Sequence, residues 1–299
     1  MADKKSNLKA VPLLSQTRRL LRQFDLKARK RLGQHFLIDG EVLSLIVGTA
    51  ELTPDDVIVE VGPGLGILTK ELARRAGWVI AIELDDKLAA LLQQTLASFD
   101  NVTIINDDVL RIEPEDLVKG REVGYKVVAN LPYYITSPVL RHFLEASAKP
   151  QTMIVMVQKE VAEAIAAKPG QMSLLSVSVQ FYGEPRIISY VPSQCFYPAP
   201  EVDSAVLRID LYPQPPVAIA DEGSFFELVR AGFAAPRKQL VNSLAQGLGL
   251  SKAEVLPLLE RANIESRRRA ETLTLEEWAR LRQIFEEKEN ANRSGAGQD

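Results

Sequence analysis

The sequence predicts an α/β fold in which a seven-stranded sheet is followed by a small C-terminal all-α domain. Three observations lead to this prediction. Short apolar runs alternate with helical patterns between about residues 56 and 167, as in a parallel sheet. The later β-rich runs need no intervening helices, which suits a sheet closed by an antiparallel hairpin. Beyond a proline-rich linker at 213–216, only helical patterns remain.

The individual elements follow from the spacing of apolar residues along the chain. The expected strands span 56–61, 78–82, 102–105, 126–129, 152–158, 186–191 and 204–212, and the run 174–182 is also expected to be β-rich. The expected helices span 40–50, 67–76, 85–97, 138–146 and 159–167, and then 222–231, 238–247, 252–261 and 275–287. Pro138 falls in the first turn of its helix, where proline is well tolerated.

These elements divide the chain of 299 residues into four segments. We expect a basic, flexible arm over 1–26, a sheet domain over 27–212, a helical domain over 213–289 and a disordered tail over 290–299. The length suffices for one large α/β domain and a smaller partner.

The composition excludes several classes of protein. No apolar run approaches the ~20 residues that cross a bilayer, and the N-terminus lacks the apolar segment of a secretory signal. We therefore expect a cytoplasmic protein without a membrane partner. Cys195 is the single cysteine, and His35 and His142 are the two histidines. An internal disulfide and a cysteine- or histidine-rich metal centre are therefore not expected, and no metal is expected.

The charge is unevenly distributed along the chain. The net charge of −3 argues against nucleic acid as a partner, yet the first 31 residues hold ten Lys or Arg against two Asp. A second basic cluster comprises Arg267, Arg268 and Arg269, with Arg237 and Lys238 before it. Local clusters rather than the mean charge bind phosphate, although each cluster alone is also typical of a solvated surface.

A glycine-rich loop, Gly62-Pro63-Gly64-Leu65-Gly66, lies between the first expected strand and its helix. Glycines let the backbone turn sharply and let a ligand approach without meeting a Cβ. Such a loop occurs in both dinucleotide and S-adenosylmethionine folds. This loop lacks the G-x-G-x-x-G sequence pattern that brings a pyrophosphate to a helix N-terminus. Glu60 precedes it, and a carboxylate there favours the sulfonium and ammonium groups of S-adenosylmethionine.

Acidic residues follow the next two strands. Glu83 ends the 78–82 run about twenty positions after the glycines, where a carboxylate is placed to bind ribose hydroxyls. Asp107 and Asp108 follow the 102–105 run, and either carboxylate is a candidate to accept a hydrogen bond from the amine of an adenine. The alternatives are a solvent-exposed acid at a strand end and ordinary turn chemistry.

The tetrapeptide Asn130-Leu131-Pro132-Tyr133 follows the buried run 126–129, at the edge of the sheet where ligands collect. Its composition suits an adenine as methyl acceptor, because the Asn130 side-chain oxygen and the Leu131 carbonyl can accept hydrogen bonds from the exocyclic amine. Pro132 restricts Leu131 to an extended conformation, and Tyr133 offers a π-face to an unstacked base. Catalysis would then be mainly positioning and electrostatics. The alternative is a strand that ends in a proline turn.

Several motifs occur together and in order, and their combination is more specific than any one of them. They are Gly33-Gln34-His35-Phe36-Leu37, Glu60-Val61-Gly62-Pro63-Gly64-Leu65-Gly66, Glu83, Asp108, Asn130-Leu131-Pro132-Tyr133 and Phe196-x-Pro198-x-Pro200-x-Val202-x-Ser204. From about residue 27 to 281 the chain resembles the ribosomal RNA adenine dimethylases, most nearly their bacterial small-subunit members. The resemblance implies a Rossmann-like class I methyltransferase sheet and S-adenosylmethionine as methyl donor.

The resemblance also implies a substrate and partners. Two adjacent adenosines in the 3′-terminal hairpin loop of 16S rRNA would become N6,N6-dimethyladenosines during biogenesis of the 30S subunit. The expected partners are 16S rRNA and the immature 30S subunit, and the enzyme is expected to be a monomer. The basic run Lys27, Arg29, Lys30 and Arg31 is expected to contribute to RNA binding.

Individual residues receive roles from the same resemblance. The cofactor is expected on His35, Leu37, Gly62, Glu83, Asp108 and Asn130, which favours Asp108 over Asp107 for the adenine amine. The expected catalytic residues are Asn130, Leu131, Tyr133 and Phe196, with Phe196 as the second aromatic wall for the target base. The chain departs from the family pattern at His35 and Tyr134, since Asn is frequent at both positions.

Three other functions compete with this interpretation. A related 23S rRNA adenine methylase shares the core motifs, but the 33–37 and 196–204 segments favour the small-subunit enzyme. A ribosome-assembly factor that acts mainly by binding immature 30S particles is compatible with the same residues. A nicotinamide dehydrogenase would require the G-x-G-x-x-G pattern of dinucleotide-binding folds, which the glycine loop lacks.

Overall fold

The computed structural model describes residues 12–29, 33–120 and 124–295, and within these ranges the chain forms two compact units. The first unit holds the described residues up to Lys159 together with Ile187–Ile209, and the second holds Glu160–Arg186 and the described residues from Asp210 onward. The division differs from the expected one, because 160–186 cluster with the helical region rather than with the sheet.

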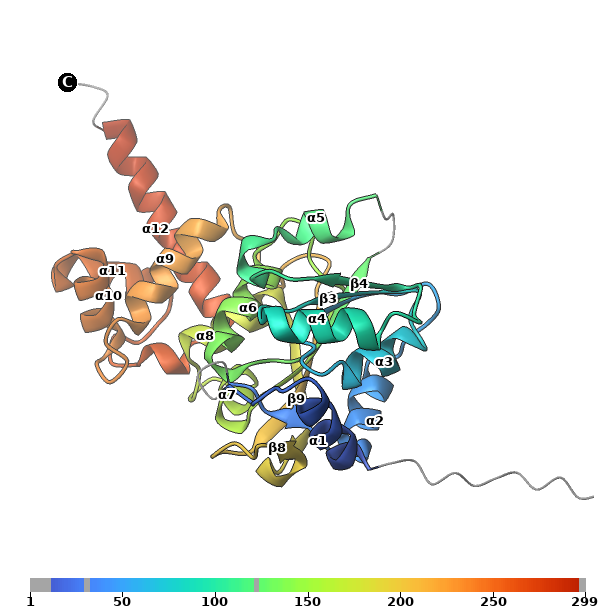
Figure 1. The fold of residues 1–299 in the computed structure, drawn as a ribbon. Coiled ribbons are helices and arrows are strands. Elements are labelled where there is room, and N and C mark those ends of the chain that lie inside the picture. The colour runs from blue at the N-terminus through green and yellow to red at the C-terminus, as the bar shows by residue number, and fades with distance from the viewer. Residues whose placement is uncertain (1–11, 30–32, 121–123, 296–299) are drawn as a thin grey trace, which may run out of the picture. The chain divides into compact units, whose positions relative to one another are not determined.

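The seven-stranded sheet predicted from the sequence is present (Figure 1). Its strands are β2 (Val57–Val61), β3 (Trp78–Ile82), β4 (Val102–Ile105), β5 (Tyr125–Asn130), β6 (Thr152–Gln158), β7 (Gly183–Val191) and β9 (Ser204–Leu211). Their order is β4-β3-β2-β5-β6-β9-β7, and the pairs from β4 to β6 are parallel. This is the class I methyltransferase topology, in which the last strand inserts beside the fifth parallel one.

The strand order reverses direction between β2 and β5. From β2 the chain builds outward through β3 and β4, and it then returns to add β5 on the other side of β2. Val57 pairs with Tyr125 and Val59 with Val127, so the carboxyl ends of β2 and β5 lie side by side. Ligands of open α/β sheets bind at such a switch point, because the helices that follow the two strands diverge there.

The central strands are mainly apolar because the sheet is covered on both faces there. All residues of β2 are buried, Glu60 among them, as expected for a central parallel strand. The helices of the first unit are α2 (Gly40–Thr49), α3 (Ile67–Ala73), α4 (Asp86–Thr95), α5 (Pro114–Val118) and α6 (Thr136–Leu144). Asp39 caps α2 and Asp85 caps α4 through side-chain acceptors, and α4 packs along β4 (Figure 1).

A second, two-stranded sheet joins two motifs that are far apart in the sequence. Strand β1 (Phe36–Leu37) pairs antiparallel with β8 (Phe196–Tyr197), which places Phe36 opposite Tyr197 and Leu37 opposite Phe196. The pairing continues where the Ile38 amide donates to the Cys195 carbonyl at 2.8 Å. The Gly-Gln-His-Phe-Leu segment is thereby attached to the Phe-x-Pro-x-Pro segment.

The prediction of a β-rich run at 174–182 is wrong, because these residues form helix α8 (Leu174–Tyr182). The alternation of apolar residues with Ser176, Ser178 and Gln180 imitates a strand, but these polar side chains bond to backbone carbonyls of nearby helical turns. Ser176 donates to Ala164, Ser178 to Leu174, and Gln180 to Ile165 and Ala167. Ser173 also begins the helix with a capping box.

Parts of the expected flexible arm and of the expected disordered tail are helical. Residues 13–23 of the arm form helix α1 (Leu13–Gln23), whose amphipathic pattern buries Thr17 and Leu21. At the other end, helix α12 (Leu275–Gly295) continues through the first part of the expected tail. The predictions for 1–11, for 296–299 and for Lys30 and Arg31 of the basic run lie outside the described residues.

The second unit is helical and has an aromatic core. It contains α7 (Lys159–Ile165) and α8, followed by α9 (Glu222–Phe233), α10 (Leu240–Leu248), α11 (Lys252–Arg261) and α12. The Phe181 ring of α8 lies 5.1 Å from Phe225 and 5.2 Å from Phe226 of α9, which explains why 160–186 belong to this unit. Gly232 gives Trp278 the space that a Cβ would occupy.

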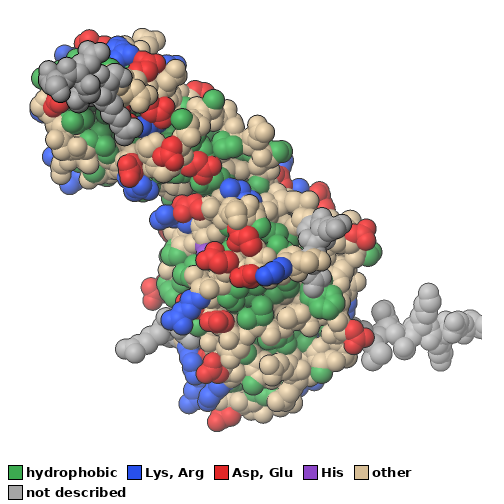
Figure 2. Space-filling view, turned by 90° about the horizontal axis from the view of Figure 1, so that it is seen from above, with side chains coloured by type: hydrophobic (Ala, Val, Ile, Leu, Met, Phe, Trp, Pro, Cys, Tyr) green, Lys and Arg blue, Asp and Glu red, His purple; other side chains and the backbone are tan. Residues whose placement is uncertain are grey.

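The basic cluster of the second unit does not act as one surface. Arg268 forms ion pairs with Glu277 and donates to the Thr272 carbonyl, so it links two segments of the helical unit. Arg237, Lys238 and Arg267 are exposed. On the face of the molecule in Figure 2, acidic and basic side chains are interspersed, and Lys and Arg side chains gather at one edge. The net charge of the chain therefore does not describe how charge is distributed over this face.

Among the described residues, no helix combines the length and the apolar character that a membrane span requires.

Candidate active site

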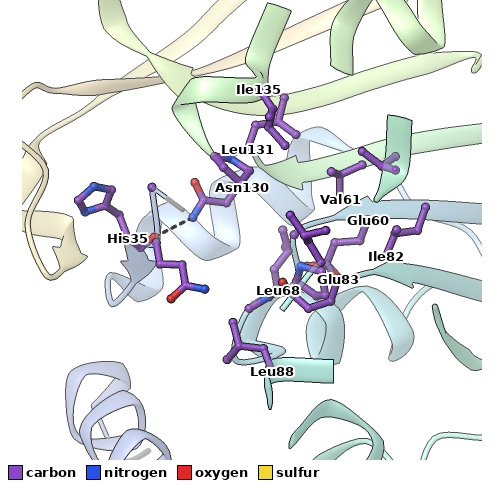
Figure 3. Close-up of a pocket in the computed structure, with 18 of the residues that line it drawn as sticks. His35, Glu60, Val61, Leu68, Ile82, Glu83, Leu88, Asn130, Leu131 and Ile135 are labelled. Carbon is purple, nitrogen blue, oxygen red and sulfur yellow. Dashed lines mark hydrogen bonds between the residues drawn. The ribbon is translucent and has the colours of Figure 1, made fainter. Parts of the chain in front are cut away.

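A pocket opens in the first unit at the switch point between β2 and β5 (Figure 3). It is lined by parts of five segments, which are 33–37, 60–68, 82–88, 107–110 and 130–135. The structure thus brings together every predicted site residue except Phe196, namely His35, Leu37, Gly62, Glu83, Asp108, Asn130, Leu131 and Tyr133.

The glycine loop has the backbone conformation that its composition predicts. Gly62, Gly64 and Gly66 have φ angles of 69°, 58° and 72°, in the left-handed region that favours glycine. A Cβ on Gly62 would lie 3.4 Å from Cδ of Pro132, and one on Gly66 would lie 2.8 Å from Cδ2 of Leu92. The loop therefore lies in van der Waals reach of the tetrapeptide, and the positive φ at Gly62 is what favours glycine at that position.

Glu60 presents a buried carboxyl group to the pocket. Its side chain is 2% exposed, and no described residue forms a hydrogen bond with its Oε2. Burial raises the pKa of Glu60 to about 8; the nearby Thr69 hydroxyl lowers it and the Glu83 carboxylate raises it slightly. A buried acceptor without a protein donor favours a ligand that brings a cation or an N–H group.

Glu83 holds the glycine loop with both of its carboxylate oxygens. Oε2 accepts from the Gly64 amide at 3.0 Å, and Oε1 accepts from the Asp85 amide at 2.9 Å. Burial raises the pKa of Glu83, while these backbone donors oppose the shift. Carboxylate oxygens have further lone pairs, so the predicted contact with ribose hydroxyls is compatible with this geometry and stays a prediction.

Asp107 and Asp108 both line the pocket, at the end of β4. Asp108 is half-buried and accepts from the Leu110 amide at 3.0 Å, whereas Asp107 is exposed and accepts from the Asp108 amide at 2.7 Å. Burial, together with the charges of Asp108 and Glu83, raises the pKa of Tyr134. Tyr134 also lines the pocket, and its side chain is 52% exposed.

Asn130 ends β5, and the protein fixes the orientation of its side-chain amide. Nδ2 donates to the backbone carbonyl of His35 at 3.1 Å (Figure 3). A carbonyl cannot donate, so the nitrogen faces His35 and Oδ1 occupies the other branch of the planar amide. The acceptor oxygen of Asn130 is therefore directed away from the His35 carbonyl.

Tyr133 begins a short turn, Tyr133–Ile135, directly after the proline. Its ring stacks with the His35 imidazole, with centroids 5.7 Å apart and planes inclined by 22°. Its hydroxyl forms a hydrogen bond of 2.7 Å with Oγ of the buried Ser204, and burial raises the pKa of Tyr133. His35 in turn donates from Nδ1 to the Pro198 carbonyl at 2.8 Å. Three segments thus hold the ring.

Leu131, Leu37 and Phe196 are the predicted site residues with buried apolar side chains. The Leu131 amide donates to the Met156 carbonyl at 3.1 Å, which continues the β5–β6 pairing by one residue. Leu37 lines the pocket and belongs to the core cluster. Phe196 is 2% exposed within the same cluster, and in this structure its ring offers no free face to a base. Its predicted role as an aromatic wall stays a prediction.

Three pocket features were not predicted as site residues. Ser204, which anchors the Tyr133 hydroxyl, is the last residue of the quoted Phe-x-Pro motif, and that position is the signal for it. Leu84 and Leu110 line the pocket although they are exposed by 47% and 37%. Both lie one or two residues after a predicted acid, where an apolar side chain can cover the face of a bound base.

The donor set of the pocket fits S-adenosylmethionine. Among the described residues, no group of three or more His, Cys, Asp or Glu side chains is arranged to hold a metal. The unpartnered Oε2 of Glu60 suits a cationic ligand, and the exposed leucines suit a base. The junction between the glycine loop and α3 lacks the G-x-G-x-x-G pattern that binds a pyrophosphate.

Comparison with known proteins identifies the family. The model of the family "Ribosomal RNA adenine dimethylase" matches residues 25–284. The chain belongs to the ribosomal RNA adenine dimethylase family. A Dehalococcoides mccartyi member named ribosomal RNA small subunit methyltransferase A is 53% identical over 92% of this chain and 94% of its own length.

Solved structures show the same fold. The 23S rRNA methyltransferase ErmE is 30% identical, with a TM-score of 0.66 over 84% of this chain and 99% of that one. A dimethyladenosine transferase from Plasmodium falciparum is 22% identical, with a TM-score of 0.71 over 85% of this chain and 98% of that one. Both proteins therefore share the fold of the present chain over more than four fifths of its length.

Proposed function

We propose that this dimethylase transfers methyl groups from S-adenosylmethionine to N6 of two adjacent adenosines in the 3′-terminal hairpin loop of 16S rRNA. The observation that carries the proposal is the fixed amide of Asn130 at the carboxyl end of β5, beside the glycine loop. The amide presents an acceptor oxygen where an exocyclic amine would meet the cofactor pocket. Family membership makes adenine the base that brings this amine.

On the cofactor side, the residues proposed to hold S-adenosylmethionine are His35, Leu37, Gly62, Glu83, Asp108 and Asn130. When bound, the cofactor supplies a methyl group activated by its sulfonium. Glu83 would accept from the ribose hydroxyls and Asp108 from the adenine amine, while Glu60 would favour the cationic groups. The backbone turn at Gly62 lets the ligand approach without meeting a side chain.

On the substrate side, Oδ1 of Asn130 and the Leu131 carbonyl would accept hydrogen bonds from N6 of the target adenine. Two acceptors on one nitrogen draw it towards a tetrahedral geometry, which makes its lone pair available. Tyr133 would stack on the base, a contact worth about 1–3 kcal/mol. Phe196 is proposed as the second aromatic contact. No strong general base is required, so positioning and electrostatics carry the catalysis.

The small ribosomal subunit is favoured over the large one by the comparisons. The Dehalococcoides mccartyi relative is named as a small-subunit methyltransferase and is 53% identical, whereas the 23S rRNA methyltransferase ErmE is 30% identical. We further propose that the protein acts in the cytoplasm as a monomer on immature 30S particles.

The experiment that tests the function maps methylated adenines. Small subunits and large subunits that lack adenine dimethylation are incubated with the protein and labelled S-adenosylmethionine, and the modified positions are identified by mass spectrometry of RNA fragments. The proposal predicts label on N6 of two adjacent adenosines near the 3′ end of 16S rRNA. Label only in 23S rRNA would assign the protein to the large subunit, and label in neither would refute the function.

A further inference from the structure

Helix α1 is attached to the first unit by its apolar face. Thr17 and Leu21 are buried. Leu21 belongs to a hydrophobic core cluster, and Leu20 and Phe24 pack against that cluster. That cluster also contains Leu88, Leu91, Leu92 and Leu96 of the α4 region. Because its apolar face is held in this way, α1 presents its opposite face at fixed positions rather than as a mobile tail.

The opposite face of α1 is strongly basic. Arg18, Arg19 and Arg22 are exposed, and the helix contains no acidic residue. None of the described carboxylates forms an ion pair with these three arginines. Elsewhere the pattern differs, since Arg74 and Arg75 of α3 both pair with Glu71. The positive charge on α1 is therefore not neutralised by the described protein.

The basic face of α1 lies next to both α3 and the pocket segments. The Arg18 guanidinium lies over the Tyr197 ring, 5.2 Å from its centroid, and Tyr197 pairs with the pocket residue Phe36. On the α3 side, burial lowers the pKa of Lys70, and the nearby charges of Arg74 and Arg19 lower it further. Like charges held close together repel one another unless an anion lies between them.

We propose that the arginine face of α1, defined as Arg18, Arg19 and Arg22, binds the phosphate backbone of the rRNA strand that flanks the target adenosine. The proposal rests on the proposed function, and it concerns a surface outside the pocket that adjoins the 196–204 motif at Tyr197. Arginine forks match phosphate geometry, and contiguous unpaired arginines are typical of backbone contacts. Continuity with Tyr197 places the surface where an RNA strand would enter.

Arg29, a described residue of the basic run, makes a different kind of contact. Arg29 forms an ion pair of 3.0 Å with the buried Asp85, and Gln34 donates to the same carboxylate at 3.3 Å. Asp85 in turn donates its amide to Glu83. Arg29 therefore supports the pocket wall, whereas the arginine face of α1 is available to an external anion.

The test measures binding of the full-length protein to small subunits that lack adenine dimethylation, over a series of salt concentrations. Arg19→Gln and the double variant Arg19→Gln/Arg22→Gln are compared with Arg141→Gln, a control in which the exposed arginine is paired with Glu145. The salt slope, d log K/d log[salt], should fall in magnitude by about one per lost phosphate contact. Arg19→Lys should retain most of the slope, and S-adenosylmethionine affinity should be unchanged in all variants.

The outcomes separate this proposal from the proposed function. An unchanged slope in the double variant, while the wild-type protein still methylates adenines of 16S rRNA, would overturn the α1 surface alone. A slope that falls equally in Arg141→Gln would mean that binding depends on the net charge of the protein rather than on α1. That result would also overturn the α1 surface. Weaker binding to purified ribosomal proteins with unchanged binding to protein-free 16S rRNA would assign the face to a protein partner instead. Circular dichroism of each variant establishes that α1 is intact.

Discussion

The two sides of the pocket are built in different ways. The loop side consists of residues 60–66 and 83–85, which lie at the ends of neighbouring parallel strands and are held by backbone conformation and by Glu83. The Asn130 side joins residues 33–38, 130–135 and 196–204, which are far apart in the sequence and are held by side-chain hydrogen bonds and a ring stack.

The difference indicates a division of labour. The loop side is determined locally by glycines and strand ends, which is suitable for a cofactor that binds alike in every turnover. The Asn130 side depends on long-range contacts among His35, Tyr133 and Ser204, which orient the groups that would meet the RNA base. Substitutions on the loop side should therefore change mainly cofactor affinity, and those of Tyr133 and Ser204 should change mainly the rate of methyl transfer. His35, Leu37 and Asn130 are also proposed to hold the cofactor, so their substitution should affect both.

The largest effect is expected from Asn130→Ala. Loss of the oriented acceptor should reduce the rate of methyl transfer by about 10²–10³-fold, the range seen when one preorganised hydrogen-bonding group is removed from an active site. Single-turnover transfer to small subunits at saturating cofactor measures it. A fall of less than threefold would mean that the amide does not contact the reacting amine.

Two controls separate the roles of the Asn130 amide. Asn130→Asp keeps an acceptor oxygen but loses donation to the His35 carbonyl, so it should fall between wild type and Asn130→Ala. Asn101→Ala removes an amide that donates to Ala73 and Ala76 outside the pocket, and it should lower stability without slowing transfer. If Asn130→Ala still binds immature 30S particles and supports their maturation, binding is the principal role.

Next in size is a pH effect through Glu60. A glutamate in the unfolded chain ionises near pH 4.5, whereas burial holds the folded group protonated up to about pH 8. Between these values the folded protein binds the additional proton, so its stability should fall as pH rises. A cationic ligand favours the ionised form, so S-adenosylmethionine affinity should rise by up to tenfold per pH unit towards pH 8.

Glu60→Gln tests this linkage because it cannot ionise. Cofactor titrations at pH 6, 7 and 8 should show weaker and flatter binding for the variant than for wild type, and thermal unfolding of the variant should depend less on pH. Glu83 remains in both proteins, so any pH dependence that persists belongs to other groups. Identical pH profiles for the two proteins would contradict an unpaired Glu60 that faces the cofactor.

A smaller effect is expected from the hydrogen bond between Tyr133 and Ser204. Tyr133→Phe and Ser204→Ala should each slow transfer by a factor equivalent to about 0.5–1.5 kcal/mol, and the double variant should cost no more than either one. The matched control is Tyr125→Phe, which removes a hydroxyl that donates to Ala148 outside the pocket. Fully additive losses would show that the two residues act separately.

The sheet could be predicted from the sequence because its strands carry their own signal. The runs at β2, β3 and β6 are mainly apolar, and they are followed by glycine, acidic or lysine residues, which fixes their bounds closely. Helix α8 could not be predicted in this way. Ser178 donates to Leu174 within the same helix, whereas Ser176 and Gln180 donate to carbonyls near the end of α7 that the folded chain brings close. An alternation of polar and apolar residues therefore did not mean a strand.

The site was predictable to the extent that its residues lie at strand ends. Gly62, Glu83, Asp108 and Asn130 all follow a strand directly or within a few residues, and the parallel order brings them together. The stacking of His35 with Tyr133 was not predictable, because it depends on the pairing of β1 with β8 across about 160 residues. Helix α1 was missed because its charge concealed its apolar stripe.

The central claim is that the two sides of the pocket can be separated, and one crossed measurement tests it most directly. Cofactor affinity by titration calorimetry and the single-turnover transfer rate at saturating cofactor are measured for Gly62→Ala and Tyr133→Ala. Gly48→Ala in α2, where a Cβ meets nothing within 4 Å, is the control for a changed glycine. Gly62→Ala forces a side chain into the left-handed region at a cost of about 1–2 kcal/mol.

The account predicts that Gly62→Ala weakens cofactor binding but retains most of the transfer rate once the cofactor is saturating. Tyr133→Ala should slow transfer by about 5- to 150-fold, the equivalent of 1–3 kcal/mol of base stacking, with cofactor affinity within twofold of wild type. Parallel losses of affinity and rate in both variants would contradict the account, because the two sides would then form a single cooperative site.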